Sequence, residues 1–205
     1  MAAGPDGGDD LDVLALERLR RARMASVALL GLALVVLTAT GAHLTTSYRP
    51  TSAQAWGERY AALSDGSRPA RTAHRWSGLA AVPLGAVAGC LALAEAVVAR
   101  GRRSLAGLGV VLGPVLAAAV AGACLTGLLL PYDQLALWSV TVGSDIRGYG
   151  PVFGDEVRFA LIGGAEVSAQ ELRARFVGHL ALAAAAVVLL VLVARGPAAR
   201  RRSVR

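Results

Sequence analysis

Charged residues are scarce in this chain of 205 residues: only 17% are charged, whereas 55% are hydrophobic. The apolar residues lie in long blocks and not in short periodic stripes, which excludes a sizeable soluble domain and favours the membrane class. A helix that crosses the hydrocarbon layer of a membrane needs about 20 mostly apolar residues. Four stretches satisfy this requirement, at residues 24–46, 73–99, 105–130 and 176–194.

Lysine is absent, so every basic side chain other than histidine is an arginine. The arginines gather beside the ends of the apolar stretches, which accounts for the net charge of +7 without a surface for nucleic acid. Because cytoplasmic segments are enriched in Arg and Lys, both termini are expected in the cytoplasm and the two longer loops outside. The three clusters are Arg18, Arg20, Arg21 and Arg23; Arg100, Arg102 and Arg103; and Arg195, Arg200, Arg201, Arg202 and Arg205.

Cysteine is nearly absent as well. Cys90 and Cys124 both fall inside apolar stretches, and neither belongs to a CxxC or CxxCH arrangement. This pattern argues against a thiol redox motif and against covalent haem attachment, and the two thiols are interpreted as small buried hydrophobes. The first apolar stretch exceeds the roughly 7 to 15 apolar residues of a signal peptide, so it is expected to be an uncleaved anchor.

These features predict an all-α membrane protein, a bundle of four transmembrane helices with both termini cytoplasmic. The membrane domain is expected at residues 24–196. Residues 1–23 are expected to form a disordered tail and a short amphipathic helix on the inner membrane surface, and residues 197–205 a basic cytoplasmic tail. The second outer loop, residues 131–175, is long for a structureless segment, so short helices packed on the outer face are expected there.

The chain has three histidines, His43, His74 and His179. His74 and His179 stand near the outer ends of the second and fourth stretches, which run in the same direction, so their imidazoles are expected at similar depth. Two neutral imidazoles that face each other across a bundle can supply both axial ligands of a haem iron. His43 has no partner at its level and is interpreted as an interfacial histidine.

A flat macrocycle between four helices also requires the other two helices to approach without intervening side chains. Gly41 and Gly127 lie several residues before the outer ends of the first and third stretches, at the level of the two histidines. Arg71 and Arg75 flank His74, a position suited to pairing with haem propionates near the interface. An alternative stays open, because intramembrane histidines also bond neighbouring helices and glycines also serve close packing.

Five segments match one known family in their order along the chain. SYRPT, at residues 47–51, resembles the loop after that family's first helix, and RTAHRWSG, at 71–78, the start of its second. TGLLLPYDQLALWSVTVG, at 126–143, resembles the end of its third helix and the beginning of its quinol-site loop, and GPVFGDEV and LIGGAEVSAQEL resemble the rest of that loop. The chain thus resembles the N-terminal, haem-carrying half of cytochrome b from cytochrome bc complexes, particularly the photosynthetic form.

The resemblance implies a haem b nearer the outer face, with His74 and His179 as its iron ligands. It also implies that Gly41 and Gly127 pack against the haem ring and that Arg71 contacts a propionate. The implied process is electron transport in a respiratory chain of the plasma membrane. Oxidoreductase activity would belong to a complex and not to this chain alone.

The chain departs from the family at a second haem site near the inner face. There the family has one more histidine on each of its second and fourth helices. The corresponding residues here are Ala88 and either Val193 or Ala194, which cannot bind iron. Val27 replaces the inner glycine of the first helix, although Gly113 is retained on the third. The inner haem is therefore expected to be absent.

Further departures lie around other positions. Ala25 stands where the photosynthetic form has a cysteine that tethers an additional haem, so that haem is not expected either. Arg175 and Phe176 precede His179 by one residue less than in the family, and one residue rotates a side chain by about 100° on a helix. The proline that usually follows this histidine is missing, so the match is weaker at His179 than at His74.

Three functions stay open at this point. The first is a single-haem b-type cytochrome subunit that exchanges electrons with a quinol or with a redox partner docked on the second outer loop. The second is a degenerate, non-redox scaffold or assembly subunit derived from cytochrome b. The third is a quinol oxidoreductase completed by a separately encoded C-terminal half and an iron–sulfur protein. Membrane lipid is a partner in all three, and no nucleic-acid partner is expected.

Overall fold

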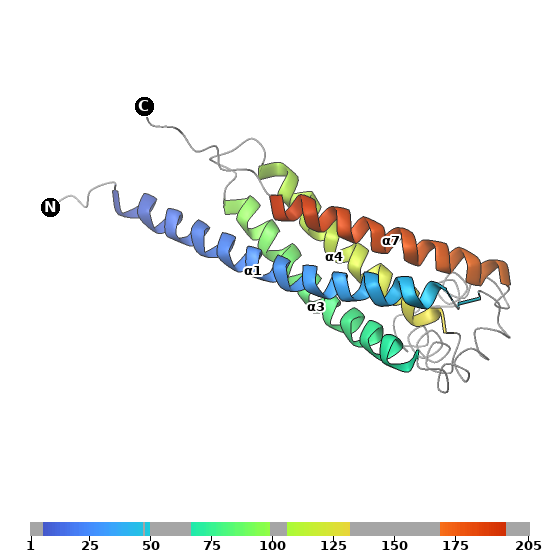
Figure 1. The fold of residues 1–205 in the computed structure, drawn as a ribbon. Coiled ribbons are helices and arrows are strands. Elements are labelled where there is room, and N and C mark those ends of the chain that lie inside the picture. The colour runs from blue at the N-terminus through green and yellow to red at the C-terminus, as the bar shows by residue number, and fades with distance from the viewer. Residues whose placement is uncertain (1–5, 47, 50–66, 99–105, 132–168, 196–205) are drawn as a thin grey trace, which may run out of the picture. The chain divides into compact units, whose positions relative to one another are not determined.

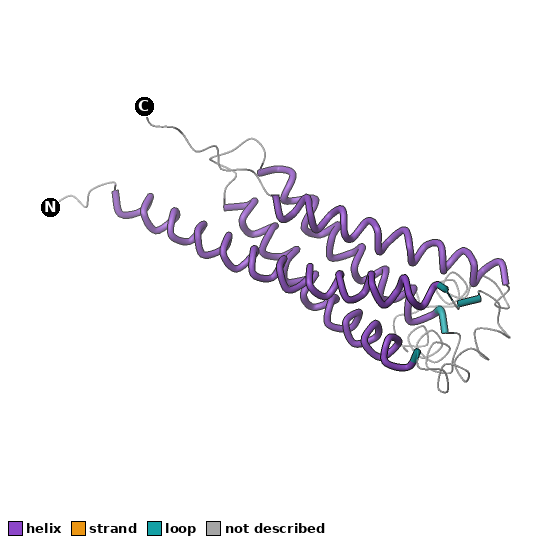
Figure 2. The backbone as a smooth tube through the Cα atoms, in the orientation of Figure 1, coloured by secondary structure: helices purple, strands orange, loops and turns teal. Residues whose placement is uncertain are grey.

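The computed structural model of the chain describes residues 6–46, 48–49, 67–98, 106–131 and 169–195. These residues form four α-helices, which Figure 1 labels α1 (Asp6–Thr45), α3 (Arg68–Val98), α4 (Ala106–Leu129) and α7 (Ala169–Arg195). Figure 2 shows that helix accounts for almost all of the described chain and that no strand occurs within it.

All four helices are long and apolar enough to cross a membrane. Their most apolar windows reach a mean hydropathy of 2.1 in α1, 2.0 in α3 and α4, and 2.7 in α7. The predicted fold class, an all-α membrane protein with four spanning helices, is therefore confirmed. The predicted side of the membrane for each terminus stays a prediction.

The helix ends differ from the predicted stretches. α3 begins at Arg68 and α7 at Ala169, several residues before the predicted starts, and α1 is continuous from Asp6. Residues 6–23, expected as a tail and a separate short helix, therefore continue directly into the first span. Apolarity marks only the part of a helix that crosses hydrocarbon, whereas backbone bonding can continue the helix beyond it. The short helices predicted in the second outer loop fall on residues 132–168, outside the described residues.

Local sequence explains where α1 ends and where α3 begins. The backbone carbonyl of Ser67 accepts a hydrogen bond from the backbone nitrogen of Arg71 at 3.1 Å, so Ser67 stands at the N-cap position of α3. Pro69 follows in the first turn, where a missing N–H breaks no helical hydrogen bond. At the end of α1, the hydroxyls of Thr45 and Thr46 donate to the carbonyls three residues earlier, at 2.8 Å in both cases.

The described chain divides into two compact units, and each unit contains a part of every helix. Unit 1 comprises Met1–Val35, Leu79–Ala121 and Ala184–Arg205, and unit 2 comprises Val36–Gly78 and Gly122–Ala183. Because membrane helices gain little from burying apolar surface against each other, their association depends on close packing and on polar contacts within each unit.

Small residues bring α3 and α4 together in unit 1. The buried face of α3 consists mainly of alanine and glycine at helical spacing. At Gly89 and Gly113 the two backbones approach so closely that a Cβ on Gly89 would lie 2.6 Å from the Gly113 carbonyl oxygen, and a Cβ on Gly113 would lie 2.5 Å from that of Gly89. No larger residue fits at either position without moving a helix.

Tyr48 connects three elements in unit 2, just beyond the end of α1. Its hydroxyl donates a hydrogen bond to the carbonyl of Leu130 at 2.9 Å. Its ring lies 5.1 Å from that of Phe176 on α7, measured between centroids. Leu129, Leu130 and Leu172 form the buried apolar part of this unit.

Gly113→Ala tests the α3–α4 contact. We expect a lower thermal midpoint for loss of helical circular dichroism in detergent, with a cost of about 1–3 kcal/mol for overpacking, because the new methyl group would force the two backbones apart. Gly31→Ala is the matched control in the same unit, since its Cβ would lie 3.6 Å from Leu190, an ordinary contact. Equal midpoints for the two variants would contradict the close approach.

Candidate functional site

The structure brings His74 of α3 and His179 of α7 together in unit 2. Their ring centroids lie 6.2 Å apart, and the ring planes are inclined at 67°. Both side chains are partly buried. The two histidines selected from the sequence for their matching depth are therefore neighbours in space.

His179 directs its Nδ1 atom toward α4. This nitrogen lies 2.9 Å from the carbonyl oxygen of Ala123 and 3.3 Å from Oγ1 of Thr126. A carbonyl oxygen can only accept, so Nδ1 carries the hydrogen and donates it. The Thr126 hydroxyl donates its own hydrogen to the carbonyl of Gly122 at 2.8 Å, which leaves its oxygen as an additional acceptor. In a neutral imidazole, Nε2 then keeps a free lone pair.

His74 is held in the same way by α1. Its Nδ1 lies 3.0 Å from Oγ1 of Thr40, and the Thr40 hydroxyl donates its hydrogen to the carbonyl of Val36 at 2.6 Å. The threonine oxygen can therefore accept a hydrogen bond from Nδ1–H, and in that tautomer Nε2 of His74 is again the nitrogen available to a ligand.

Thr40 and Thr126 are residues of the candidate site that the sequence did not single out. Each immediately precedes one of the two selected glycines, so the dipeptide Thr-Gly occurs at 40–41 on α1 and at 126–127 on α4. The repetition of this dipeptide on two spans is the sequence feature that could have identified the two threonines. A threonine inside a helix usually bonds back to the carbonyl of its preceding turn, and the second acceptor role of its oxygen becomes visible only in the structure.

Gly41 and Gly127 lie directly against the two imidazoles. A Cβ on Gly41 would be 3.2 Å from Cε1 of His74, and a Cβ on Gly127 would be 2.9 Å from Cε1 of His179. Each glycine of the predicted set therefore faces one histidine of the set. A larger residue at Gly127 would displace the ring of His179 from its position.

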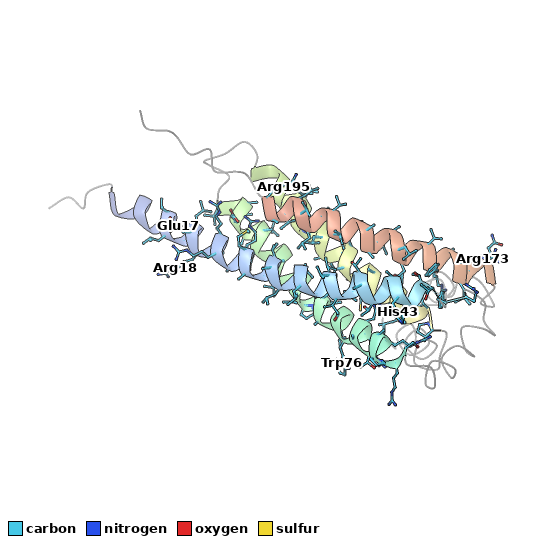
Figure 3. All side chains as sticks on the ribbon, in the orientation of Figure 1. Glu17, Arg18, His43, Trp76, Arg173 and Arg195 are labelled. Carbon is cyan, nitrogen blue, oxygen red and sulfur yellow. The ribbon has the colours of Figure 1, made fainter. Side chains whose placement is uncertain are left out.

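The two selected arginines differ in their surroundings. Arg71 is partly buried, and its Nε atom has no hydrogen-bond partner among the described residues. Arg75 is exposed. Arg71 precedes His74 by three residues and shares its helix face, whereas Arg75 is displaced by about 100° around the axis. Trp76 is 65% exposed, and its side chain points away from the helices, as Figure 3 shows; His43 is exposed as well.

The set of donors does not suit a bare metal ion. Within the part of the chain that the structure describes, no group of three or more His, Cys, Asp or Glu side chains could hold one. A pair of imidazoles with free Nε2 atoms suits an iron whose other ligands come from a macrocycle. The sequence matches, over residues 22–194, the family described as cytochrome b/b6/petB.

The chain belongs to the cytochrome b family.

Curated members of the cytochrome b family show the same likeness over shorter segments. The chain is 37% identical to cytochrome b6 of Heliomicrobium gestii over 67 residues, which are 32% of this chain and 32% of that protein. It is 37% identical to cytochrome b6 of Heliobacterium mobile over 59 residues, 29% of this chain and 28% of that protein. The chain thus aligns with about a third of the length of these relatives. The resemblance drawn from the sequence is confirmed at the level of the family.

Three residues that the resemblance places at a second, inner haem site lie in unit 1. Ala88 is fully buried, and Val193 is 4% exposed. Val27, which the resemblance aligns with an inner glycine, is also buried. The side chains of alanine and valine cannot bind iron. The absence of an inner haem stays a prediction.

Proposed function

We propose that this protein is a membrane b-type cytochrome subunit that carries electrons through one haem b, whose iron His74 and His179 would bind. We further propose that it acts in a quinol-linked respiratory electron-transfer complex of the plasma membrane. The observation that carries the proposal is the pair of adjacent imidazoles whose Nδ1 atoms each lie within hydrogen-bonding distance of an oxygen on a neighbouring helix, an arrangement that suits a hydrogen on Nδ1 and a free lone pair on Nε2.

The separation of the rings supports this assignment. Two imidazoles that held one metal ion between them, with metal–nitrogen bonds of roughly 2 Å, would keep their ring centroids within about 6 Å of each other. The observed separation is 6.2 Å. The absence of side chains at Gly41 and Gly127 is consistent with a flat group that must lie close to helix backbones.

The residues of the chain would hold and adjust the cofactor. Haem supplies one-electron chemistry when it is bound. The hydrogen bonds from Nδ1 of His74 and His179 fix the tautomer and the direction of each ring and make Nε2 a stronger donor to the metal. Arg71, on the same helix face as His74, offers a cation for a propionate.

A single haem cannot relay electrons across the membrane by itself, so the proposed subunit needs partners. Within this proposal the candidates are a quinone, an iron–sulfur protein and a separately encoded C-terminal half of cytochrome b. The segments that resemble the quinol-site loop fall mostly on residues 132–168, outside the described residues, and the last of these segments continues into the first turn of α7.

A second candidate function is a non-redox scaffold or assembly subunit derived from cytochrome b. The observation that favours it is in unit 1, where the resemblance aligns Ala88 and either Val193 or Ala194 with iron ligands of the family. The two candidates differ in one respect that can be measured, which is the presence of a b-type haem in unit 2.

A reduced-minus-oxidised spectrum of the purified protein, with its haem-to-polypeptide ratio, tests the proposal. We expect a b-type spectrum and one haem per chain. His74→Ala and His179→Ala should each abolish haem binding, because each removes one of the two iron ligands. His43→Ala is the matched control and should retain the haem, because His43 is exposed. A protein without b-type absorption would contradict the electron-transfer function and favour the scaffold function.

Thr40→Val tests whether the hydroxyl group orients His74. The valine keeps the shape of the threonine but removes the acceptor for Nδ1–H, so we expect weaker haem retention, on the order of tenfold, as for other residues that support a metal ligand. Thr40→Ser keeps the hydroxyl and should retain near-normal affinity. The measurement is the rate of haem transfer from the purified protein to a haem-free acceptor protein. Equal rates for Thr40→Val and Thr40→Ser would show that the hydroxyl group does not support His74.

A further inference from the structure

Unit 1 contains a buried ion pair. Nε of Arg23 on α1 lies 2.5 Å from Oε2 of Glu95 on α3, and the two residues are 4% and 9% exposed. A second guanidinium nitrogen of Arg23 donates a hydrogen bond to the carbonyl of Val193 on α7. The backbone carbonyl of Arg23 accepts a further bond from the hydroxyl of Ser26 at 2.9 Å. One arginine side chain thus connects three helices.

Burial of this pair needs a physical reason, because charges removed from water are costly unless they are paired and fully bonded. The Arg21–Glu17 pair of the same helix provides the contrast. Its oxygen–nitrogen distance is 3.1 Å, and its side chains are 81% and 58% exposed, so this pair contributes little to the stability of the fold. The side chain of Arg23, in contrast, is folded inward between the helices.

The buried pair lies on the helix faces that would surround a second haem. Arg23 precedes Val27, which replaces the inner glycine, by four residues and therefore lies on the same face of α1. Glu95 follows Ala88 by seven residues, two turns along the same buried face of α3. Val193, which accepts the bond from Arg23, is itself one of the two positions that correspond to the missing ligand on α7.

We propose that Arg23, Glu95 and the Val193 carbonyl form an electrostatic clamp that joins α1, α3 and α7 in the place of a second haem. The direct approach of Gly89 and Gly113 joins α4 to α3 in the same unit. Unit 1 is thereby held together by protein groups alone. This inference concerns unit 1 and does not rest on the haem proposed for unit 2.

A double-mutant cycle on the full chain tests the clamp. Glu95→Gln and Arg23→Met should each lower the detergent unfolding midpoint, because each leaves a buried partner without its counter-charge. The double variant Arg23→Met with Glu95→Gln removes both charges, and its midpoint should fall by less than the sum of the decreases in the two single variants. Glu17→Gln and Arg21→Met are the matched controls and should leave the midpoint unchanged.

Additive effects in this cycle, or midpoints of the single variants equal to those of the controls, would overturn the clamp. If a single variant fails to fold, Glu95→Asp, which keeps the charge, should fold and retain most of the wild-type midpoint. If Glu95→Asp also fails to fold and the double variant is unstable, the clamp is overturned as well. The haem content of wild-type protein separates the two proposals. Two haems per chain would exclude replacement of a haem by the clamp, whereas no haem would remove only the function proposed for unit 2.

Discussion

Hydrocarbon offers no hydrogen-bond partner, so each polar group placed inside a spanning helix must find its partner within the protein. This constraint explains both polar centres of the molecule. In unit 2, Thr40 satisfies the Nδ1 atom of His74 and at the same time bonds back to its own helix. In unit 1, Arg23 satisfies Glu95 and a carbonyl that belongs to α7. The same requirement thus produces an oriented ligand pair in one unit and a charge-neutral link in the other.

The two units differ in what their small residues do. In unit 2, Gly41 and Gly127 face imidazole rings, so the missing side chains provide space for a ring. In unit 1, Gly89 and Gly113 face each other's carbonyl groups, so the missing side chains allow backbone contact. Glycine therefore makes room for a side-chain ring in unit 2 and permits a backbone contact in unit 1.

Prediction from the sequence succeeded where a signal is local. Long apolar stretches predicted the four helices, and the placement of His74 and His179 near matching helix ends predicted that they are neighbours. Prediction failed where a contact joins residues that are far apart in the sequence. Arg23 was interpreted as one of several arginines beside a helix end, because its partner Glu95 lies 72 positions away. Nothing in a single sequence distinguishes an arginine directed to a headgroup from one folded into the bundle.

The close packing of unit 1 also limits which side chains this unit can accommodate. Ala88 is fully buried, so a histidine there would overpack the interior by a whole imidazole ring. α3 and α4 are already in backbone contact at Gly89 and Gly113, next to this position. The ring would therefore be accommodated only if the two helices moved apart and lost that contact. Unit 1 thus opposes the introduction of a large side chain at Ala88 by a single substitution.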